Sequence, residues 1–317
     1  MSERDRAAEP RPVTLTIAVL TYRRPDDLAE LLPLLVDQAT SAAAYRVDVM
    51  IVDNDPEAGA AAFVRDGAGR GPVRYVHEPR PGIAAARNRA LDEASDAELL
   101  VFIDDDERPG PDWLADLLRV REREGCAAVV GPVVSRYAVE PDPWIAAGEF
   151  FRRRRLPTGT DVDVAATNNL LLDLGRVRAH GLRFDERFGL IGGEDTLFTR
   201  ALVAAGERLV WCDEAVVTDV VPPARLTRSW VLRRAFSSGN AAALVEAELH
   251  PGWSGLRRRA RRVGDGLVRA AGGGARAVLG TVLASPAHQA KGCRTAARGA
   301  GMISGAAGYR YGEYRRT

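Results

Sequence analysis

Leu99-Leu100-Val101-Phe102-Ile103-Asp104-Asp105-Asp106-Glu107 joins five apolar residues to four consecutive carboxylates. The apolar run predicts a buried strand over residues 99–103. Carboxylates gathered at the end of such a strand repel one another unless a cation neutralises them. Oxygen ligands suit Mg²⁺ or Mn²⁺, and Mg²⁺ is often held by one or two carboxylates plus substrate phosphates. The stretch therefore indicates either a metal site for a phosphate-bearing substrate or a solvated acidic turn.

Two other apolar runs also end in polar residues. Residues 13–20 lead into Thr21-Tyr22-Arg23, and residues 47–52 lead into Asp53-Asn54. Segments with helical spacing, such as residues 26–37, separate these runs. The alternation predicts an α/β fold with a parallel sheet and helices on both faces. Because ligands bind outside the carboxyl ends of such strands, three polar ends indicate one shared crevice.

Composition and charge divide the chain. With 317 residues, of which 46% are hydrophobic and 27% charged, it is expected to be globular and soluble. Residues 225–317 hold 17 basic and 4 acidic side chains, a net charge of +13, against −12 for the rest. We expect a disordered N-terminus at residues 1–12, a catalytic domain at 13–240 and a basic, amphipathic helical extension at 241–317. The basic side chains of this C-terminal region favour contact with an anionic membrane surface, or they form a solvated face of a helix.

Several classes of chemistry are disfavoured. Lys291 is the sole lysine, so the main domain lacks the residue that a P-loop or a lysine Schiff base needs. The three cysteines form no C-x-x-C pair, which favours a reducing cytosol over a disulfide framework. No signal-peptide core and no apolar run of about 18 residues is present. We therefore expect a cytoplasmic protein, peripheral on the inner face of the plasma membrane if the extension binds lipid.

Taken together, residues 15–22, 51–54, 80–88, 104–106 and 192–195 resemble the family 2 glycosyltransferases of the GT-A fold. The resemblance covers about residues 13–240 and is similar in kind to bacterial exopolysaccharide members such as those of succinoglycan assembly. It implies a Rossmann-like, mostly parallel sheet flanked by helices, here with a C-terminal helical extension. It also implies transfer of a sugar from a nucleotide-diphosphate sugar, usually a UDP-sugar, to an acceptor hydroxyl with Mg²⁺ or Mn²⁺ as cofactor.

The resemblance assigns roles position by position. The nucleotide-binding residues it implies are Thr21, Tyr22, Arg23, Asp53, Gly82, Arg87, Asn88, Asp104 and Asp105. Asp106 matches the metal ligand. Asp195 matches the general base, with Glu194 as its catalytic neighbour, although an aspartate here also suits a plain helix N-cap. A single base opposite the leaving group implies one displacement with inversion at the anomeric carbon.

Four residues are candidates for contact with the donor sugar or the acceptor. Asn168 and Asn169 interrupt an apolar strand, where they either contact a sugar or satisfy a buried turn. Trp144 lies in the segment that shapes the acceptor pocket of related enzymes, where it either stacks on a sugar or packs in the core. Gly193 precedes the Glu194-Asp195 pair and allows close approach of a substrate.

One departure from the family pattern concerns the metal. Many relatives carry a further histidine ligand where this chain reads Val216-Val217-Thr218-Asp219 and continues without a histidine to residue 223. Either Asp219 replaces that histidine as an oxygen ligand, or Asp106 alone binds the ion.

Three other readings compete with a transferase. A dinucleotide-dependent oxidoreductase needs G-x-G-x-x-G after the first strand, where residues 21–25 read Thr-Tyr-Arg-Arg-Pro. A nucleotidyltransferase generally has a glycine-rich, basic triphosphate loop near the N-terminus, and we find none. A catalytically weak or inactive sugar-nucleotide binding protein fits the missing histidine. The expected partners are a nucleotide-sugar donor and a sugar, lipid-linked or small-molecule acceptor, with no nucleic acid.

Overall fold

The computed structural model describes residues 11–67, 71–250 and 252–312. Its main sheet has seven strands in the order β3-β2-β1-β4-β8-β6-β9. These strands are β1 (Val13–Thr21), β2 (Tyr45–Asp53), β3 (Val73–His77), β4 (Leu99–Asp104), β6 (Ala128–Val130), β8 (Asn169–Asp173) and β9 (Leu209–Trp211). All neighbours pair in parallel except β8, which is antiparallel to both β4 and β6. The predicted α/β fold with a mostly parallel sheet is confirmed.

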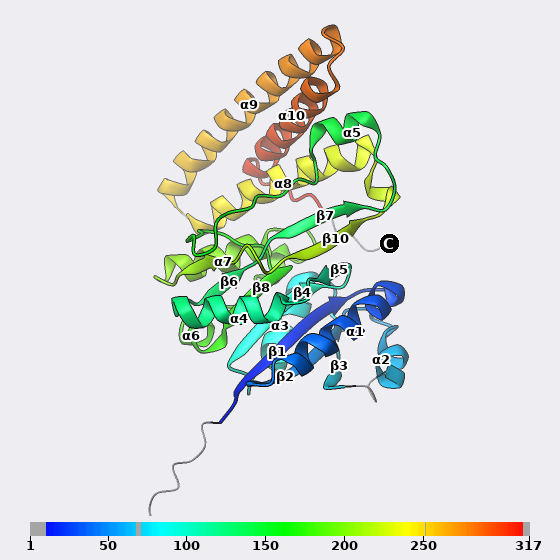
Figure 1. Cartoon of the computed structure of the whole chain (residues 1–317). Coiled ribbons are helices and arrows are strands. Elements are labelled where there is room, and N and C mark those ends of the chain that lie inside the picture. Colours follow the sequence, from blue (N-terminus) through cyan, green and yellow to red (C-terminus); the bar gives the residue numbers. More distant parts are fainter. Residues whose placement is uncertain (1–10, 68–70, 251, 313–317) are drawn as a thin grey trace, which may run out of the picture.

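Helices cover both faces of this sheet (Figure 1). On one face lie α1 (Pro25–Ser41), α2 (Ala61–Gly67) and α4 (Trp113–Glu124), and on the other α3 (Ile83–Glu93), α6 (Leu174–Ala179) and α7 (Glu194–Ala204). Alternation along β1 explains the two layers, because Ile17 packs with the leucines of α1 while Ala18 packs with the alanines of α3. Each fully buried leucine or isoleucine contributes about 1.5–3 kcal/mol.

The register of the strands brings their polar ends together. Thr21 at the end of β1 is paired with Asp53 of β2, and Leu20 is paired with Asp104 of β4. A second, three-stranded sheet of β5 (Glu107–Pro109), β10 (Val217–Val221) and β7 (Val133–Tyr137) continues from this edge. Within it Asp219 is paired with Glu107, so β10 lies beside the acidic turn.

A layer of helices follows, formed by α5 (Pro143–Gly148), α8 (Arg228–Leu249), α9 (Trp253–Val282) and α10 (Pro286–Ala306). Figure 1 shows α9 and α10 as a hairpin, with α10 between α8 and α9. Glycines permit this closeness: a Cβ at Gly301 would collide with the carbonyl oxygen of Phe236, and one at Gly273 with the backbone of Ala296. The expected C-terminal helical extension is present.

Two boundaries of the expected domains can be compared with these elements. The boundary at 240/241 falls inside the continuous helix α8, which contacts both α7 and α10. The expected disorder at residues 1–12 lies mostly outside the described part of the chain, which begins at residue 11, and β1 starts at Val13. None of the helices in the described ranges combines the length and apolarity that crossing a bilayer requires.

Candidate active site

A cavity of about 1130 Å³ opens at the carboxyl edge of the main sheet. Its floor is formed by the ends of β1 and β4, and its walls by α3, α7, α8 and α10. The predicted site residues that line it are Thr21, Tyr22, Arg23, Gly82, Arg87, Asp104, Asp105, Asp106, Asn168, Gly193, Glu194, Asp195 and Asp219. The structure thus brings together side chains that are almost 200 positions apart in the chain.

The acidic turn after β4 directs its carboxylates to different partners. Asp105 is 4% exposed and turns toward β1, where Thr21 Oγ1 donates to it at 2.9 Å and Arg24 Nη1 lies 2.7 Å from its Oδ1. Burial raises the pKa of Asp105 to about 7, against the opposing charge of Arg24. Asp105 therefore fixes the turn to the end of β1 and is not the most accessible of the three aspartates.

Asp104 and Glu107 are held together by the backbone of the same turn. Glu107 is 1% exposed, and its Oε2 accepts a hydrogen bond from the Asp104 amide at 3.2 Å. Its Oε1 accepts one from Asn168 Nδ2 at 2.7 Å, which orients the Asn168 amide along the cavity wall. Burial, with Asp106 adding to the effect, raises the pKa of Asp104 to about 6.

Arginines balance the charge of Asp106 and Asp219. Asp106 Oδ2 lies 3.0 Å from Arg24 Nη1 and 3.0 Å from Arg225 Nη2. Asp219 is 5% exposed and pairs with Arg153 at 3.0 Å, while Arg225 Nη1 lies 3.9 Å from its Oδ1. A single guanidinium thus bridges the two carboxylates that the sequence indicated as metal ligands.

Asp106 and Asp219 have the chemistry of ligands for a divalent ion. Asp219 Oδ1 is buried and accepts no hydrogen bond from the described residues, so it has unused ligand capacity. Within the described ranges no group of three or more His, Cys, Asp or Glu side chains has a metal-binding arrangement. Two carboxylates nevertheless suit Mg²⁺ or Mn²⁺ when substrate phosphates and water complete the shell. Asp106 and Asp219 fit that pattern.

Asp195 lies at the start of α7, on the opposite wall. Thr196 N donates to its Oδ1 at 2.6 Å, while no described residue donates to its Oδ2. Glu194, by contrast, is 4% exposed and forms a buried ion pair with Arg87 of α3. Burial raises the pKa of Glu194, and the Arg87 guanidinium opposes that rise. The neighbouring carboxylates therefore differ: one is half-buried on the cavity wall and the other is tied into the fold.

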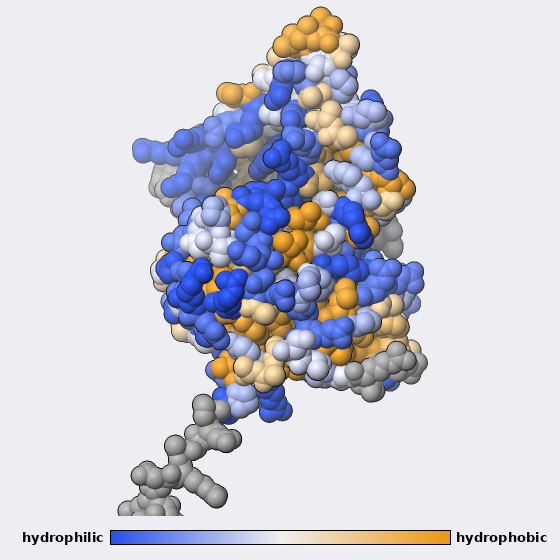
Figure 2. Space-filling model, in the orientation of Figure 1, coloured by the Kyte–Doolittle hydropathy of each residue, from blue (hydrophilic) through white to orange (hydrophobic). Residues whose placement is uncertain are grey.

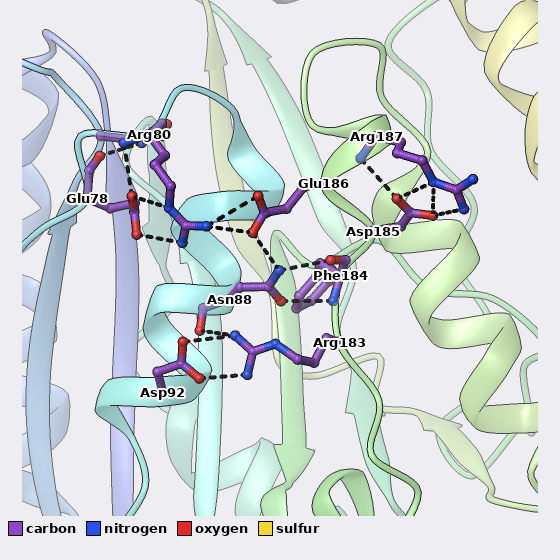
Figure 3. A network of polar contacts seen from close by, with 10 residues as sticks. Glu78, Arg80, Asn88, Asp92, Arg183, Phe184, Asp185, Glu186 and Arg187 are labelled. Carbon is purple, nitrogen blue, oxygen red and sulfur yellow. Dashed lines mark hydrogen bonds and ion pairs between the residues drawn. The ribbon is translucent and has the colours of Figure 1, made fainter.

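A polar network fixes the loop that carries these carboxylates (Figure 3). Asn88 of α3 clamps the backbone of Phe184, donating from Nδ2 and accepting at Oδ1, both at 2.9 Å. Arg183 pairs with Asp92, and Arg80 pairs with Glu186. Asn88 does not line the cavity, so its contribution is to position residues 184–195 against α3.

Three other candidates lie outside the cavity lining. Asp53 is fully buried and accepts from the Asp55 and Ala60 amides, each at 2.9 Å. Asn169 is 1% exposed, accepts from Trp113 Nε1 at 2.9 Å and donates to two backbone carbonyls. Trp144 stacks on Phe150 with ring centroids 5.2 Å apart.

These placements decide between some of the alternatives. Asn169 satisfies buried backbone groups, while its neighbour Asn168 lines the cavity. The lining also includes Phe150, Phe151 and Arg153, from the segment expected to shape the acceptor pocket, and three residues that the sequence did not single out: Arg24, Arg225 and Trp230. Of the polar pair Asp53-Asn54 that follows the second apolar run, Asn54 lines the cavity and Asp53 does not.

The sheet order and the acidic cavity at the carboxyl edge of the sheet are those of the GT-A fold. Residues 16–172 match glycosyl transferase family 2. The chain is 36% identical over 236 residues to the succinoglycan biosynthesis protein ExoM of Rhizobium meliloti (strain 1021), covering 74% of this chain and 75% of that protein. The chain therefore belongs to glycosyl transferase family 2, as its sequence predicted, and is a glycosyltransferase.

Solved structures agree on the fold. The mannosyltransferase PcManGT from Pyrobaculum calidifontis, in complex with GDP-Man and Mn²⁺, has a TM-score of 0.59 and 19% identity, covering 90% of this chain and 85% of that one. S. aureus TarS 1–349, in complex with UDP-GlcNAc, has a TM-score of 0.51 and 16% identity, covering 94% and 93%. At these identities the likeness concerns the fold alone.

Proposed function

We propose that this chain transfers a sugar from a nucleotide-diphosphate sugar, in the first place a UDP-sugar, to an acceptor hydroxyl with inversion at the anomeric carbon. One observation carries the proposal: the acidic turn after β4 and the half-buried Asp195 line the same cavity. The complex of TarS 1–349 with UDP-GlcNAc and the relationship to a succinoglycan biosynthesis protein support a nucleotide-sugar donor and a sugar acceptor.

The donor occupies the end of the cavity formed by the sheet. Tyr22, Arg23 and Asn54 line the part beside the ends of β1 and β2, where the nucleoside is expected. Arg23 pairs with Asp55 at 3.2 Å, so its guanidinium is oriented before a ligand arrives. Two hydrogen bonds hold the backbone on which these side chains lie. One joins Thr21 Oγ1 to Asp105, and the other joins the Asp55 amide to Asp53.

Asp106 and Asp219 would hold a divalent ion at the diphosphate. Such an ion would neutralise the charge that develops on a departing nucleoside diphosphate. Mn²⁺ is present in the solved complex of PcManGT, and either Mn²⁺ or Mg²⁺ suits two carboxylates plus phosphate oxygens. Arg225 contacts both carboxylates and supplies a further positive charge to the same end of the cavity.

Asp195 is the general base of this proposal. A base must lie within hydrogen-bond reach of the acceptor hydroxyl, on the face opposite the leaving group. Asp195 Oδ2 is available for such a contact, because the hydrogen bonds from Thr196 occupy Oδ1. Gly192 and Gly193 precede it with positive φ values of 81° and 98°, and both line the cavity. A single carboxylate in this place is the arrangement that one displacement with inversion requires.

The test is a donor assay with the purified chain, Mn²⁺ and a panel of nucleotide sugars. Asp195→Asn is expected to bind the donor like the parent chain while hydrolysis and transfer fall by about 10²-fold or more. Asp213→Asn, at a surface ion pair with Arg155 outside the cavity, is the matched control and keeps full turnover. Tight donor binding without turnover by the parent chain, over any acceptor, favours an inactive binding protein instead.

We also propose that the hairpin of α9 and α10 rests on an anionic membrane surface. Apolar side chains in the middle of α9 and at its C-terminal end are widely exposed: Leu267 56%, Val268 74%, Val278 66%, Leu279 49%, Val282 75% and the C-cap residue Leu283 61%. Figure 2 shows this hydrophobic tip projecting from the molecule. Arg269 and Arg276 lie on the same helix, so an apolar stripe and basic charges occur together, as in helices that lie in a lipid interface.

Vesicle flotation tests the membrane proposal. The parent chain is expected to float with vesicles that contain phosphatidylglycerol and to remain unbound with phosphatidylcholine alone. The double variant Val278→Glu, Val282→Glu is expected to lose binding, whereas Val139→Glu, at a position 48% exposed in the segment between β7 and α5, keeps it. Equal flotation of all three chains, or self-association of the parent chain through the same stripe, contradicts a lipid contact.

A further inference from the structure

The wall of the cavity opposite the sheet is basic. The acidic side chains of the lining gather on the sheet and at the start of α7, whereas α10 contributes Arg294 and Arg298 and the segment before β8 contributes Arg152 and Arg153. Arg153 is paired with Asp219 and Arg152 with Glu149. Arg294 and Arg298 belong to α10 and are one helical turn apart, so their side chains leave the same face of that helix.

These two arginines have little acidic compensation. Arg294 Nη1 contacts a backbone carbonyl, that of Glu149, at 3.4 Å, and its guanidinium lies over the ring of Phe150 at 5.8 Å. Arg298 has no carboxylate partner among the described residues. Partial burial, together with the charges of Arg269, Arg294 and Arg262, lowers the pKa of Arg298 below its usual value.

Like charges held together in a concave wall cost free energy unless a ligand neutralises them. Arginine forks match phosphate oxygens through paired N–H donors, so two forks one turn apart on the same helix suit a phosphate group. The diphosphate of the donor is assigned, in the proposed function, to the end of the cavity at the sheet, beside Asp106 and Arg225. The half-buried rings of Phe151 and Trp230 also line the cavity and stack on each other with their centroids 5.8 Å apart, and aromatic rings of this kind suit a sugar.

We propose that Arg294 and Arg298 bind a phosphate group carried by the acceptor, so that the acceptor class of this enzyme is a phosphate-bearing glycan or sugar. This inference rests on the proposed function, because it assigns the second substrate of the same cavity. A phosphate carried by a lipid and one carried by a soluble sugar present the same oxygens to the arginines. The membrane-facing hairpin that holds Arg298 is compatible with the lipid source.

The experiment measures binding rather than turnover. With the full chain saturated by UDP and Mn²⁺, α-D-glucose 1-phosphate is titrated calorimetrically, with D-glucuronate and methyl α-D-glucoside as the carboxylate and neutral comparisons. The parent chain is expected to bind the phosphate most tightly, and more tightly at low ionic strength. Arg298→Gln and Arg294→Gln are each expected to weaken this binding by about tenfold or more. Arg259→Gln, an exposed arginine of α9, is the matched control.

Each outcome separates this site from the donor site. Equal phosphate binding by the parent chain and both α10 variants overturns the proposal, as does glucuronate binding as tightly as the phosphate. Weaker UDP binding in Arg298→Gln also overturns it, because the arginines would then belong to the donor. Failure of UDP to bind the parent chain contradicts the proposed donor, while the phosphate titration remains readable without nucleotide. Geranyl phosphate binding more tightly than glucose 1-phosphate identifies the lipid source, and weaker binding identifies the soluble one.

Discussion

Replacement of Glu194 by glutamine distinguishes a structural carboxylate from the neighbouring Asp195, the proposed general base. Arg87 and Glu194 are 5% and 4% exposed, and Glu194→Gln leaves the Arg87 charge without its partner. Breaking a buried pair in this way costs about 3–5 kcal/mol. Asp195 and Asp104 also act on the Arg87 charge, so the lower end of that range, about 3 kcal/mol, is expected here.

The assay is thermal unfolding followed by calorimetry. A chain of 317 residues has an unfolding entropy of about 0.7 kcal/mol/K, so about 3 kcal/mol lowers Tm by about 4–5 °C. Asp195→Asn is expected to change Tm by less than about 1 °C, because Asp195 is only half-buried. Adding Arg87→Met to Glu194→Gln is expected to restore much of the loss, since a neutral replacement of the whole pair leaves no buried charge. Full thermal stability of Glu194→Gln, or losses in the double variant that simply add, would refute this account of the pair.

Three further predictions concern the metal, the helical layer and its packing. Asp106→Asn is expected to weaken Mn²⁺ binding, measured by electron paramagnetic resonance, by about tenfold or more. Arg225→Gln is expected to tighten Mn²⁺ binding, because the variant removes a cation that competes for the same two carboxylates. Unchanged Mn²⁺ affinity in both variants contradicts the proposed metal site. Although burial opposes it, hydrogen bonds from Arg200 and Arg262 lower the pKa of Glu246, so its stabilising effect is present above the usual value of 4.5 and is lost as the pH falls through the lowered pKa. Glu246→Gln is therefore expected to cost about 1–3 kcal/mol at pH 7 in denaturant titrations, with the difference narrowing below pH 4.5; a difference that grows in acid contradicts this sign. Gly301→Ala is expected to lower Tm, because the new Cβ would collide with the Phe236 carbonyl oxygen. Gly264→Ala in α9, where the new Cβ meets open space, is expected to raise the free energy of unfolding by about 0.5–1 kcal/mol. Equal changes in stability for the two variants contradict the close packing of α8 and α10.

The strand ends were the part of the site that the sequence predicted best. A polar residue that follows an apolar run marks the carboxyl end of a strand, and the register of β1, β2 and β4 then places these ends together. The direction of each side chain could not be predicted. Asp53 and Asn54 are adjacent in the sequence, yet Asp53 turns into the loop below while Asn54 lines the cavity. The same applies to Asn168 and Asn169.

The arginines that balance the acidic turn were not predicted. Arg24, Arg153 and Arg225 belong to separate segments, and nothing local in the sequence relates any of them to Asp106 or Asp219. Tertiary pairing of this kind depends on the packing of the second sheet against the first. Trp144 illustrates the same limit, because an aromatic residue in a loop segment suits either a sugar or a core. In the structure Trp144 packs on Phe150, and the aromatic residues of this segment that line the cavity are Phe150 and Phe151.

The two ends of the cavity are encoded in different parts of the chain. The sheet end draws on residues before α8, and the basic end draws mainly on α8 and α10, with residues 150–153 in between. With the proposed assignment of donor and acceptor to these ends, a recombination event between β10 and α8 would exchange acceptor preference and leave donor chemistry unchanged. Such a division allows new glycosidic linkages to evolve by exchange of one gene segment, while the transfer reaction stays the same.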